Sequence, residues 1–258
     1  MKKVEEKVEE KKEVKKIKKE DLKKNYQLSL EEMLKAGVHF GHKSFRWNPK
    51  MEPYVFGVRG GVHIIDLEKS LDLFQKALDF TEGVIKKNGQ ILIVGTKKQV
   101  KDLVKETAGE IKMPYVNERW IGGTFTNFKI ILKRIKYLVE TTEGLEKGKY
   151  SDLTKLERLK LKKETSRLEE KIGGLRLMTR TPEVIFILDI KKDEIAIKEA
   201  RKAGVTIIGL VDSNCDPNLV DYPIPANDDA ISSLRYILGV FQERINKIQK
   251  NTLSESKK

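Results

Sequence analysis

One histidine and two aspartates are the residues of this chain that could hold a metal ion. His42 lies in a glycine- and aromatic-rich stretch, Asp212 follows an apolar run, and Asp228 precedes the last helical pattern. Because the carboxyl ends of parallel strands converge on one edge of a sheet, these side chains could meet there. One nitrogen and two carboxylates suit a zinc-like ion. The alternative is that Asp228 caps its helix and His42 hydrogen-bonds a loop.

Basic and aromatic side chains are interleaved in several loops, as in proteins that bind folded RNA. Lys and Arg neutralise phosphates, Trp stacks on unpaired bases, and glycine lets the backbone come close. Two alternatives stay open: the tryptophans are buried loop anchors, and the lysine pairs are solvated helix starts. The candidate RNA-binding residues are Arg46, Trp47, Lys50, Lys97, Lys98, Arg119, Trp120, Lys129, Lys133, Arg134, Lys191 and Lys192.

The charge balance favours a polyanionic partner. The 258 residues include 52 Lys and Arg against 39 Asp and Glu, a net charge of +13. Residues 126–180 are the most basic part of the body, with 15 basic and 8 acidic side chains. No apolar run reaches the length of a membrane span, and the single cysteine, Cys215, excludes an internal disulfide. We therefore expect a cytoplasmic protein with no membrane partner.

An enzyme is the rival interpretation, because α/β sheets often carry active sites. Gly95-Thr96-Lys97-Lys98 follows an apolar strand and opens a helix, where backbone amides could bind a phosphorylated ligand. The turn lacks the second glycine of a nucleotide-binding loop, and no nucleophile elbow occurs in the sequence. Cys215 has no base near it in the sequence and is expected to be a small core or loop residue. The sequence thus favours a protein without catalytic residues.

Apolar strands alternate with helical patterns along most of the chain. This alternation predicts a doubly wound parallel α/β sheet with helices on both faces. Residues 38–61 are expected to form an irregular loop with short extended pieces. Strands are expected at 64–65, 91–95, 114–116, 184–189, 205–211 and around 224, and helices at 67–85, 97–108, 193–203 and from 228 onwards.

One segment interrupts the alternation. Residues 127–173 contain only charged residues and Leu or Ile at helical spacing, which predicts an inserted antiparallel helical hairpin, packed mainly on itself as a coiled coil. The stripe of its second helix includes Leu153, Leu156 and Leu159. The expected domain organisation is a charged low-complexity arm at 1–25, a sheet domain at 26–126 and 174–241, the hairpin, and the end of the last helix with a basic tail at 242–258.

Several long motifs, in one order, resemble the S-two family of small-subunit ribosomal proteins, in its bacterial form. The resemblance covers about residues 28–241. Its motifs are AGVHFGH at 36–42, RWNPKM at 46–51, HIIDL at 63–67, VGTKKQ at 94–99, RWIGG at 119–123 with TNF at 126–128, VDSNCDP at 211–217, and DYPIP at 221–225 with NDDAI at 227–231.

The resemblance implies a flavodoxin-like sheet with a protruding hairpin and a structural role in the small ribosomal subunit. It implies binding to small-subunit ribosomal RNA and to neighbouring ribosomal proteins, including the messenger-capturing protein S-one. No cofactor is required, but some family members hold a zinc ion. The matching positions are His42, Asp212 and Asp228. The arm at 1–25 lies outside the family pattern.

Overall fold

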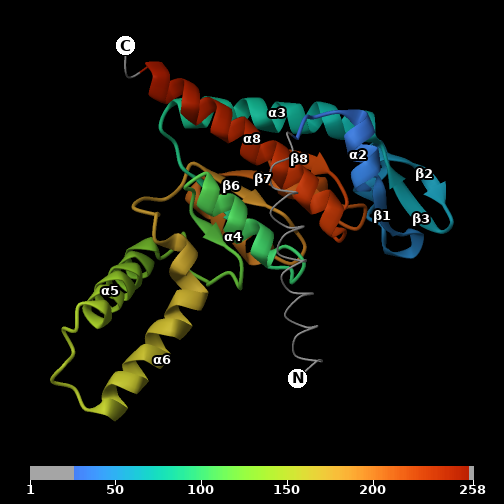
Figure 1. The fold of residues 1–258 in the computed structure, drawn as a ribbon. Coiled ribbons are helices and arrows are strands. Elements are labelled where there is room, and N and C mark those ends of the chain that lie inside the picture. Colours follow the sequence, from blue (N-terminus) through green and yellow to red (C-terminus); the bar gives the residue numbers. More distant parts are fainter. Residues whose placement is uncertain (1–25, 256–258) are drawn as a thin grey trace, which may run out of the picture.

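The computed structural model describes residues 26–255. The expected arm at 1–25 and the last residues of the basic tail lie outside the described part. Between residues 26 and 255, none of the helices combines the length and the apolar character that crossing a bilayer needs. Figure 1 shows a sheet covered by helices, with a helical hairpin standing away from it.

Five parallel strands form the central sheet. They are β4 (Ile91–Val94), β5 (Tyr115–Val116), β6 (Val184–Ile187), β7 (Thr206–Val211) and β8 (Tyr222–Pro225). Their order is β5-β4-β6-β7-β8, which is the order of flavodoxin-like folds, counted from β4 as the first strand. All residues of β4 and β6 are buried, as expected of central strands covered on both faces. The predicted parallel α/β sheet is confirmed.

Two apolar cores lie on opposite faces of this sheet, because successive strand residues point to opposite sides. Ile91 and Ile93 pack against α3 (Leu67–Lys86), α4 (Lys101–Glu110) and α8 (Ile231–Glu255). Leu92 and Val94 pack against α7 (Glu194–Ala203) and the base of the hairpin. The helix expected from residue 97 begins at Lys101, since residues 97–100 form a turn instead.

A second, antiparallel sheet occupies much of the segment expected to be an irregular loop. It contains β1 (Phe40–Lys43), β2 (Val55–Arg59) and β3 (Val62–Ile65), in the order β1-β3-β2. The 64–65 strand is therefore not part of the parallel sheet. Gly60 and Gly61 have φ values of 59° and 75°, the left-handed pair that a two-residue hairpin turn requires. The Gly-Gly signal was present in the sequence.

Short helices join these strands to the rest of the chain. Ser29 caps α2 (Leu30–Ala36), accepting a hydrogen bond from the Glu32 amide, and Gly37 ends it with a φ of 75°. The 3₁₀ helices are η1 (Ser44–Arg46), η2 (Pro49–Tyr54), η3 (Gly173–Leu175) and η4 (Pro217–Leu219).

The hairpin consists of α5 (Phe128–Glu146) and α6 (Lys155–Ile172), within the predicted segment. Thr154 and Glu157 form a reciprocal capping box that starts α6. The expectation that the hairpin packs mainly on itself is wrong at its base, because side chains of both helices join the core under the sheet. They are Ile131, Ile135, Leu138 and Ile172. Leu156 and Leu159 of the predicted stripe are 62% and 63% exposed.

Candidate RNA-facing edge and metal site

The carboxyl ends of three parallel strands bring one lysine and several aspartates together. Lys97 follows β4, Asp189 follows β6, and Asp228 and Asp229 follow β8. The Lys97 ammonium lies 3.1 Å from Asp189 Oδ2, 2.9 Å from Asp228 Oδ1 and 2.8 Å from Asp229 Oδ1. This edge is therefore acidic at its centre, where the Lys97 ammonium lies among three carboxylates.

Lys97 does not have the environment expected of a phosphate contact. Its side chain is only 17% exposed, and its ammonium also donates to the Asp228 carbonyl oxygen at 3.0 Å. Burial alone would lower the pKa of Lys97, but the charge of Asp228 and its hydrogen bond to Asp229 outweigh burial and raise that pKa. The sequence could not distinguish this lysine from its exposed neighbour Lys98.

Close packing explains the glycine of the turn at residues 95–98, which the enzyme hypothesis takes as a phosphate-binding loop. A Cβ on Gly95 would lie 2.8 Å from Val104 Cγ2 and 2.9 Å from Leu188 Cδ1, so the absence of a side chain lets the strand end pack closely against its neighbours. Since α4 begins only at Lys101, its first turn does not directly follow the strand. This geometry gives no support to a phosphate-binding loop.

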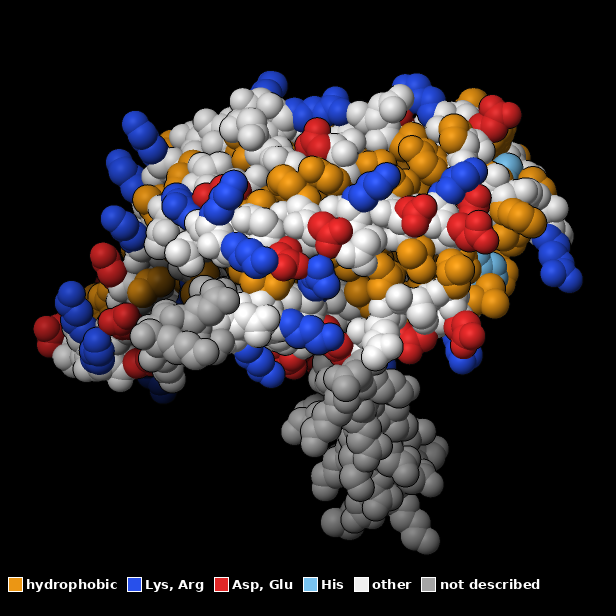
Figure 2. Space-filling view, turned by 90° about the horizontal axis from the view of Figure 1, so that it is seen from above, with side chains coloured by type: hydrophobic (Ala, Val, Ile, Leu, Met, Phe, Trp, Pro, Cys, Tyr) orange, Lys and Arg blue, Asp and Glu red, His pale blue; other side chains and the backbone are white. Residues whose placement is uncertain are grey.

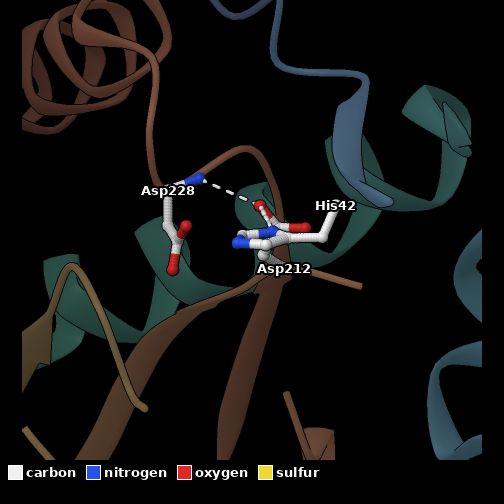
Figure 3. Close-up of side chains that lie close together, drawn as sticks. All are labelled: His42, Asp212 and Asp228. Atoms are coloured by element: carbon white, nitrogen blue, oxygen red, sulfur yellow. Dashed lines mark hydrogen bonds and ion pairs between the residues drawn. The ribbon is translucent and has the colours of Figure 1, made fainter. Parts of the chain in front are cut away.

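The three predicted metal ligands come together next to this cluster (Figure 3). His42 Nδ1 lies 3.0 Å from Asp212 Oδ2, and the Asp228 amide donates to the same oxygen at 3.4 Å. One ligand atom from each of His42, Asp212 and Asp228 lies within 4.8 Å of the others. The hydrogen bond to Asp212 raises the pKa of His42 against the effect of burial.

Close backbone packing places His42 at this position. The Gly41 position is so close to Ser213 that a Cβ would lie 2.7 Å from Ser213 Oγ. The same hydroxyl oxygen accepts a hydrogen bond from the His42 amide at 2.8 Å. Strand β1 is thus held against the segment that follows β7, and this contact aligns His42 with Asp212.

The donor set fits a divalent cation. His42 and Asp212 line an open hollow of about 360 Å³, with Arg46 at its rim, so an ion can reach them. Asp228 Oδ1 is buried, and the Lys97 ammonium lies 2.9 Å from it. Burial and the charge of Asp212 raise the pKa of Asp228. A cation would therefore relieve a crowded set of carboxylates.

Lys191 and Lys192, which follow β6, have backbone amides held by hydrogen bonds and are exposed to solvent. The amides of Lys191 and Lys192 donate to Asp189 Oδ1 at 3.0 and 2.9 Å. The Lys192 ammonium donates to the Thr96 carbonyl oxygen at 2.8 Å, which ties the loops after β4 and β6 together. Both residues are exposed overall. Lys191 and Lys98 are therefore placed at the surface of this edge.

Trp120 is buried, which is the loop-anchor alternative that the sequence left open for the tryptophans. It is 6% exposed, its ring packs edge-to-face on Phe125 at 5.1 Å between centroids, and its Nε1 donates to Glu199 Oε1 at 3.4 Å. An RNA base cannot reach this ring. The adjacent Arg119 is exposed.

The first basic loop remains accessible. Trp47 is 38% exposed and stacks on His63 with 5.0 Å between ring centroids, which leaves part of its ring open. Arg46 is exposed. The Lys50 ammonium pairs with Asp216 Oδ2 at 2.6 Å, so its charge is partly neutralised within the chain.

The hairpin carries the remaining candidate cations. Lys129, Lys133 and Arg134 are all exposed on the first half of α5. They lie close in sequence to Arg119, which precedes the hairpin. The candidate RNA-binding residues thus divide into an exposed majority and two residues, Lys97 and Trp120, that belong to the interior.

Sequence reasoning missed Glu199, Asp189 and Asp229. Glu199 is 8% exposed on α7 and accepts hydrogen bonds from the amides of Gly123 at 2.6 Å and Phe125 at 3.0 Å. Its place on the buried side of an amphipathic helix was a signal that could have been read. Asp189 ends a predicted strand, so the convergence rule used for Asp212 applied to it as well.

Comparison with known proteins identifies the family. The family described as "Ribosomal protein S2" matches residues 33–247. The protein belongs to this family. A relative from Bifidobacterium animalis subsp. lactis (strain AD011), "Small ribosomal subunit protein uS2", is 46% identical over 220 residues, which cover 85% of this chain and 73% of the relative. Within the ribosomal protein S2 family match lie both sheets, the hairpin and all three candidate metal ligands.

Proposed function

We propose that the protein is a structural, non-catalytic constituent of the small ribosomal subunit that binds small-subunit ribosomal RNA in support of translation in the cytoplasm. The observation that carries this proposal is the family match over residues 33–247. The name of the bacterial relative places that relative in the small subunit. The net charge of +13 fits a partner rich in phosphate.

The RNA contacts are assigned to the exposed cations. Phosphate neutralisation needs accessible cations and is strongest where no carboxylate already pairs with them, and most of the candidates are accessible. Trp47 offers a partly open ring for stacking on an unpaired base, while the hairpin extends the basic surface as a coiled-coil arm. The cations that carry this role are Arg46, Lys98, Arg119, Lys129, Lys133, Arg134, Lys191 and Lys192, with Lys50 in part.

We assign the binding of neighbouring proteins to a face of exposed apolar residues at the end of the molecule that holds the antiparallel sheet. Phe56 is 80% exposed, Phe45 73%, and Val58 55%. A concentration of large exposed apolar side chains is typical of a protein interface. We assign this face to neighbouring small-subunit proteins, the messenger-capturing protein S-one among them.

The metal site is assigned to zinc. His42, Asp212 and Asp228 would hold the ion, which would supply a cross-link among the segments that follow β7 and β8 and strand β1. The role is structural, because the described residues at this edge include no nucleophile with a base beside it. Lys97 partly neutralises Asp228 when no ion is bound.

Sedimentation of cell extracts tests the proposed function. The protein is expected to travel with the small subunit in a sucrose gradient at low salt and to leave it as salt is raised, since phosphate contacts weaken with ionic strength. A protein that stays at the top of the gradient would contradict the proposal. Added nucleotides should leave its melting temperature unchanged, whereas a nucleotide-binding enzyme would gain about 2.7 kcal/mol at 100 times the dissociation constant.

A further inference from the structure

A second hollow, with both polar and apolar walls, lies at the opposite edge of the parallel sheet, away from the metal site. It is formed where α3 and α4 end, together with the loop before β6 and the end of α8. Its volume is about 580 Å³, within the usual range of ligand sites. The residues that line it are Ile85, Asn88, Gly89, Gln90, Lys112, Met113, Thr179, Arg180 and Gln249.

The chemistry of these walls is cationic and amide-rich. Lys112 and Arg180 are exposed at the hollow, and Asn88, Gln90 and Gln249 supply side-chain amides. The Glu183 carboxylate lies beside it, where it accepts a hydrogen bond from the Gln90 backbone amide at 2.6 Å and pairs with Arg180. The buried faces of Ile85 and Met113, 7% and 8% exposed, contribute apolar surface. Cations beside amides and an apolar floor suit a phosphate attached to a flat, hydrogen-bonding ring.

The side chains of the hollow are held in place by contacts within the chain. The Arg180 guanidinium donates to the Asn88 carbonyl oxygen at 2.8 Å and pairs with Glu183 at 3.2 Å. An arginine has five N–H donors, so others remain for a ligand. Gln90 Nε2 donates to the Leu177 carbonyl oxygen at 2.9 Å, while its buried Oε1 has no hydrogen-bond partner.

Lys112 has a left-handed backbone conformation, which glycine would adopt with less strain. Lys112 has a φ of 54°, and Asn88 has a φ of 57°. Both follow the last turn of a helix, in the left-handed position that usually carries glycine. Asparagine tolerates this conformation, but lysine does so at a cost. The strain at Lys112 is consistent with a side chain selected for binding instead of for stability.

We propose that this hollow binds an unpaired nucleotide of ribosomal RNA, with Lys112 and Arg180 on its phosphate and the amides beside its base. This inference rests on the proposed RNA-binding function and adds a second RNA contact, at the amino edge of the sheet. Figure 2 shows Lys and Arg side chains gathered at the end of the molecule where α3 and α8 end, which favours RNA over an apolar protein segment.

The test measures how the affinity of the full-length protein for small-subunit ribosomal RNA depends on salt. Each phosphate contact to single-stranded RNA contributes about 0.7 to the slope of log K against log salt. The double variant Lys112→Ala/Arg180→Ala should therefore lower the slope by about 1.4 and weaken binding about tenfold at 0.1 M salt. The matched control is Lys76→Ala with Lys198→Ala, which also removes two exposed cations, one of them paired with a glutamate.

A second variant separates binding from folding. Lys112→Gly relieves the left-handed strain, so its melting temperature should equal or exceed that of the wild type while its RNA affinity falls and its slope drops by about 0.7. The inference is overturned if the wild type binds RNA and the hollow variants match the control in slope and affinity. It is also overturned if the hollow of assembled subunits is covered by a protein. A wild type that binds no RNA would instead refute the proposed function.

Discussion

Glu199 on α7 accepts a hydrogen bond from the Gly123 amide at 2.6 Å. The same carboxylate accepts from the Phe125 amide and from Trp120 Nε1. A single buried side chain therefore organises the loop that leads from the parallel sheet into α5. Because this loop precedes the hairpin, the position of the hairpin cations relative to the sheet depends on Glu199.

Replacing Glu199→Ala should destabilise the protein by about 2–3 kcal/mol, since several buried donors lose their charged acceptor. Urea unfolding gives the value. Glu199→Gln keeps one carbonyl oxygen and should lose less, while Glu194→Ala, which removes an exposed carboxylate from the same helix, should change the free energy of unfolding by less than about 0.5 kcal/mol. Equal effects of Glu199→Ala and Glu194→Ala would contradict this assignment.

Asp193 should make stability fall as the pH rises. Burial raises its pKa to about 6, opposed in part by its hydrogen bond from Thr96. Because the folded-state pKa exceeds the unfolded one, the folded protein holds the proton more tightly, and this contribution is lost between about pH 4 and pH 6. Relative to the wild type, Asp193→Asn should gain about 2 kcal/mol at pH 7 and little at pH 4.

The measurement for Asp193 is urea unfolding of both proteins across this pH range. Taking the difference between them cancels the titration of groups that they share. Asp72→Asn, at an exposed position of α3, is the control and should show no such trend. A difference between wild type and Asp193→Asn that is constant with pH would show that Asp193 titrates normally.

Zinc binding should depend on His42. Equilibrium dialysis of the wild type with zinc is expected to give one bound ion, and His42→Ala should weaken binding at least tenfold, because it removes the nitrogen ligand. Affinity should fall as His42 becomes protonated at low pH, at a higher pH than for an ordinary histidine because Asp212 raises its pKa. His39→Gln is the matched control. Equal zinc binding by His42→Ala and the wild type would exclude His42 as a ligand.

Charge reversal separates accessible cations from internal ones. Arg46→Glu and Lys98→Glu should each reduce incorporation into small subunits by repelling phosphate, without loss of folding, because both side chains are exposed. Lys97→Ala should instead lower stability, since it leaves Asp189, Asp228 and Asp229 without their shared cation. Gradient sedimentation and urea unfolding measure the two effects. Loss of stability in Lys98→Glu but not in Lys97→Ala would reverse this assignment.

The sequence predicted the parallel sheet because its strands are buried runs with strong local patterns. Runs such as 91–95 and 184–188 are apolar on both faces, as expected of central strands. The antiparallel sheet was predicted only as short extended pieces and a strand at 64–65, since its strands are short and carry polar and exposed residues. The local Gly60-Gly61 turn pairs β2 with β3, but the pairing of β1 with β3 joins segments about twenty residues apart. Phe40 pairs with Ile64 across this sheet, a relationship that composition does not encode.

The two aspartates of the candidate metal site were predictable from the sequence, whereas the internal role of Lys97 was not. Strand-end convergence brings Asp212 and Asp228 together whatever their neighbours are. The Lys97 side chain is held in the interior by Asp189 and Asp229, and the Trp120 side chain is held there by Glu199. Whether a basic or aromatic side chain faces solvent is decided by such tertiary partners, so a lysine of the interior and a lysine of the surface look alike in sequence.

A density map of small ribosomal subunits purified from the cells that make this protein tests the central claim most directly. The account predicts the protein bound to the subunit, with ribosomal RNA within hydrogen-bonding distance of Arg46, Lys98 and the exposed cations of α5, and with Lys97 and Trp120 making no RNA contact. A subunit that contains the protein with these cations facing solvent, or a subunit preparation that lacks the protein altogether, would contradict it.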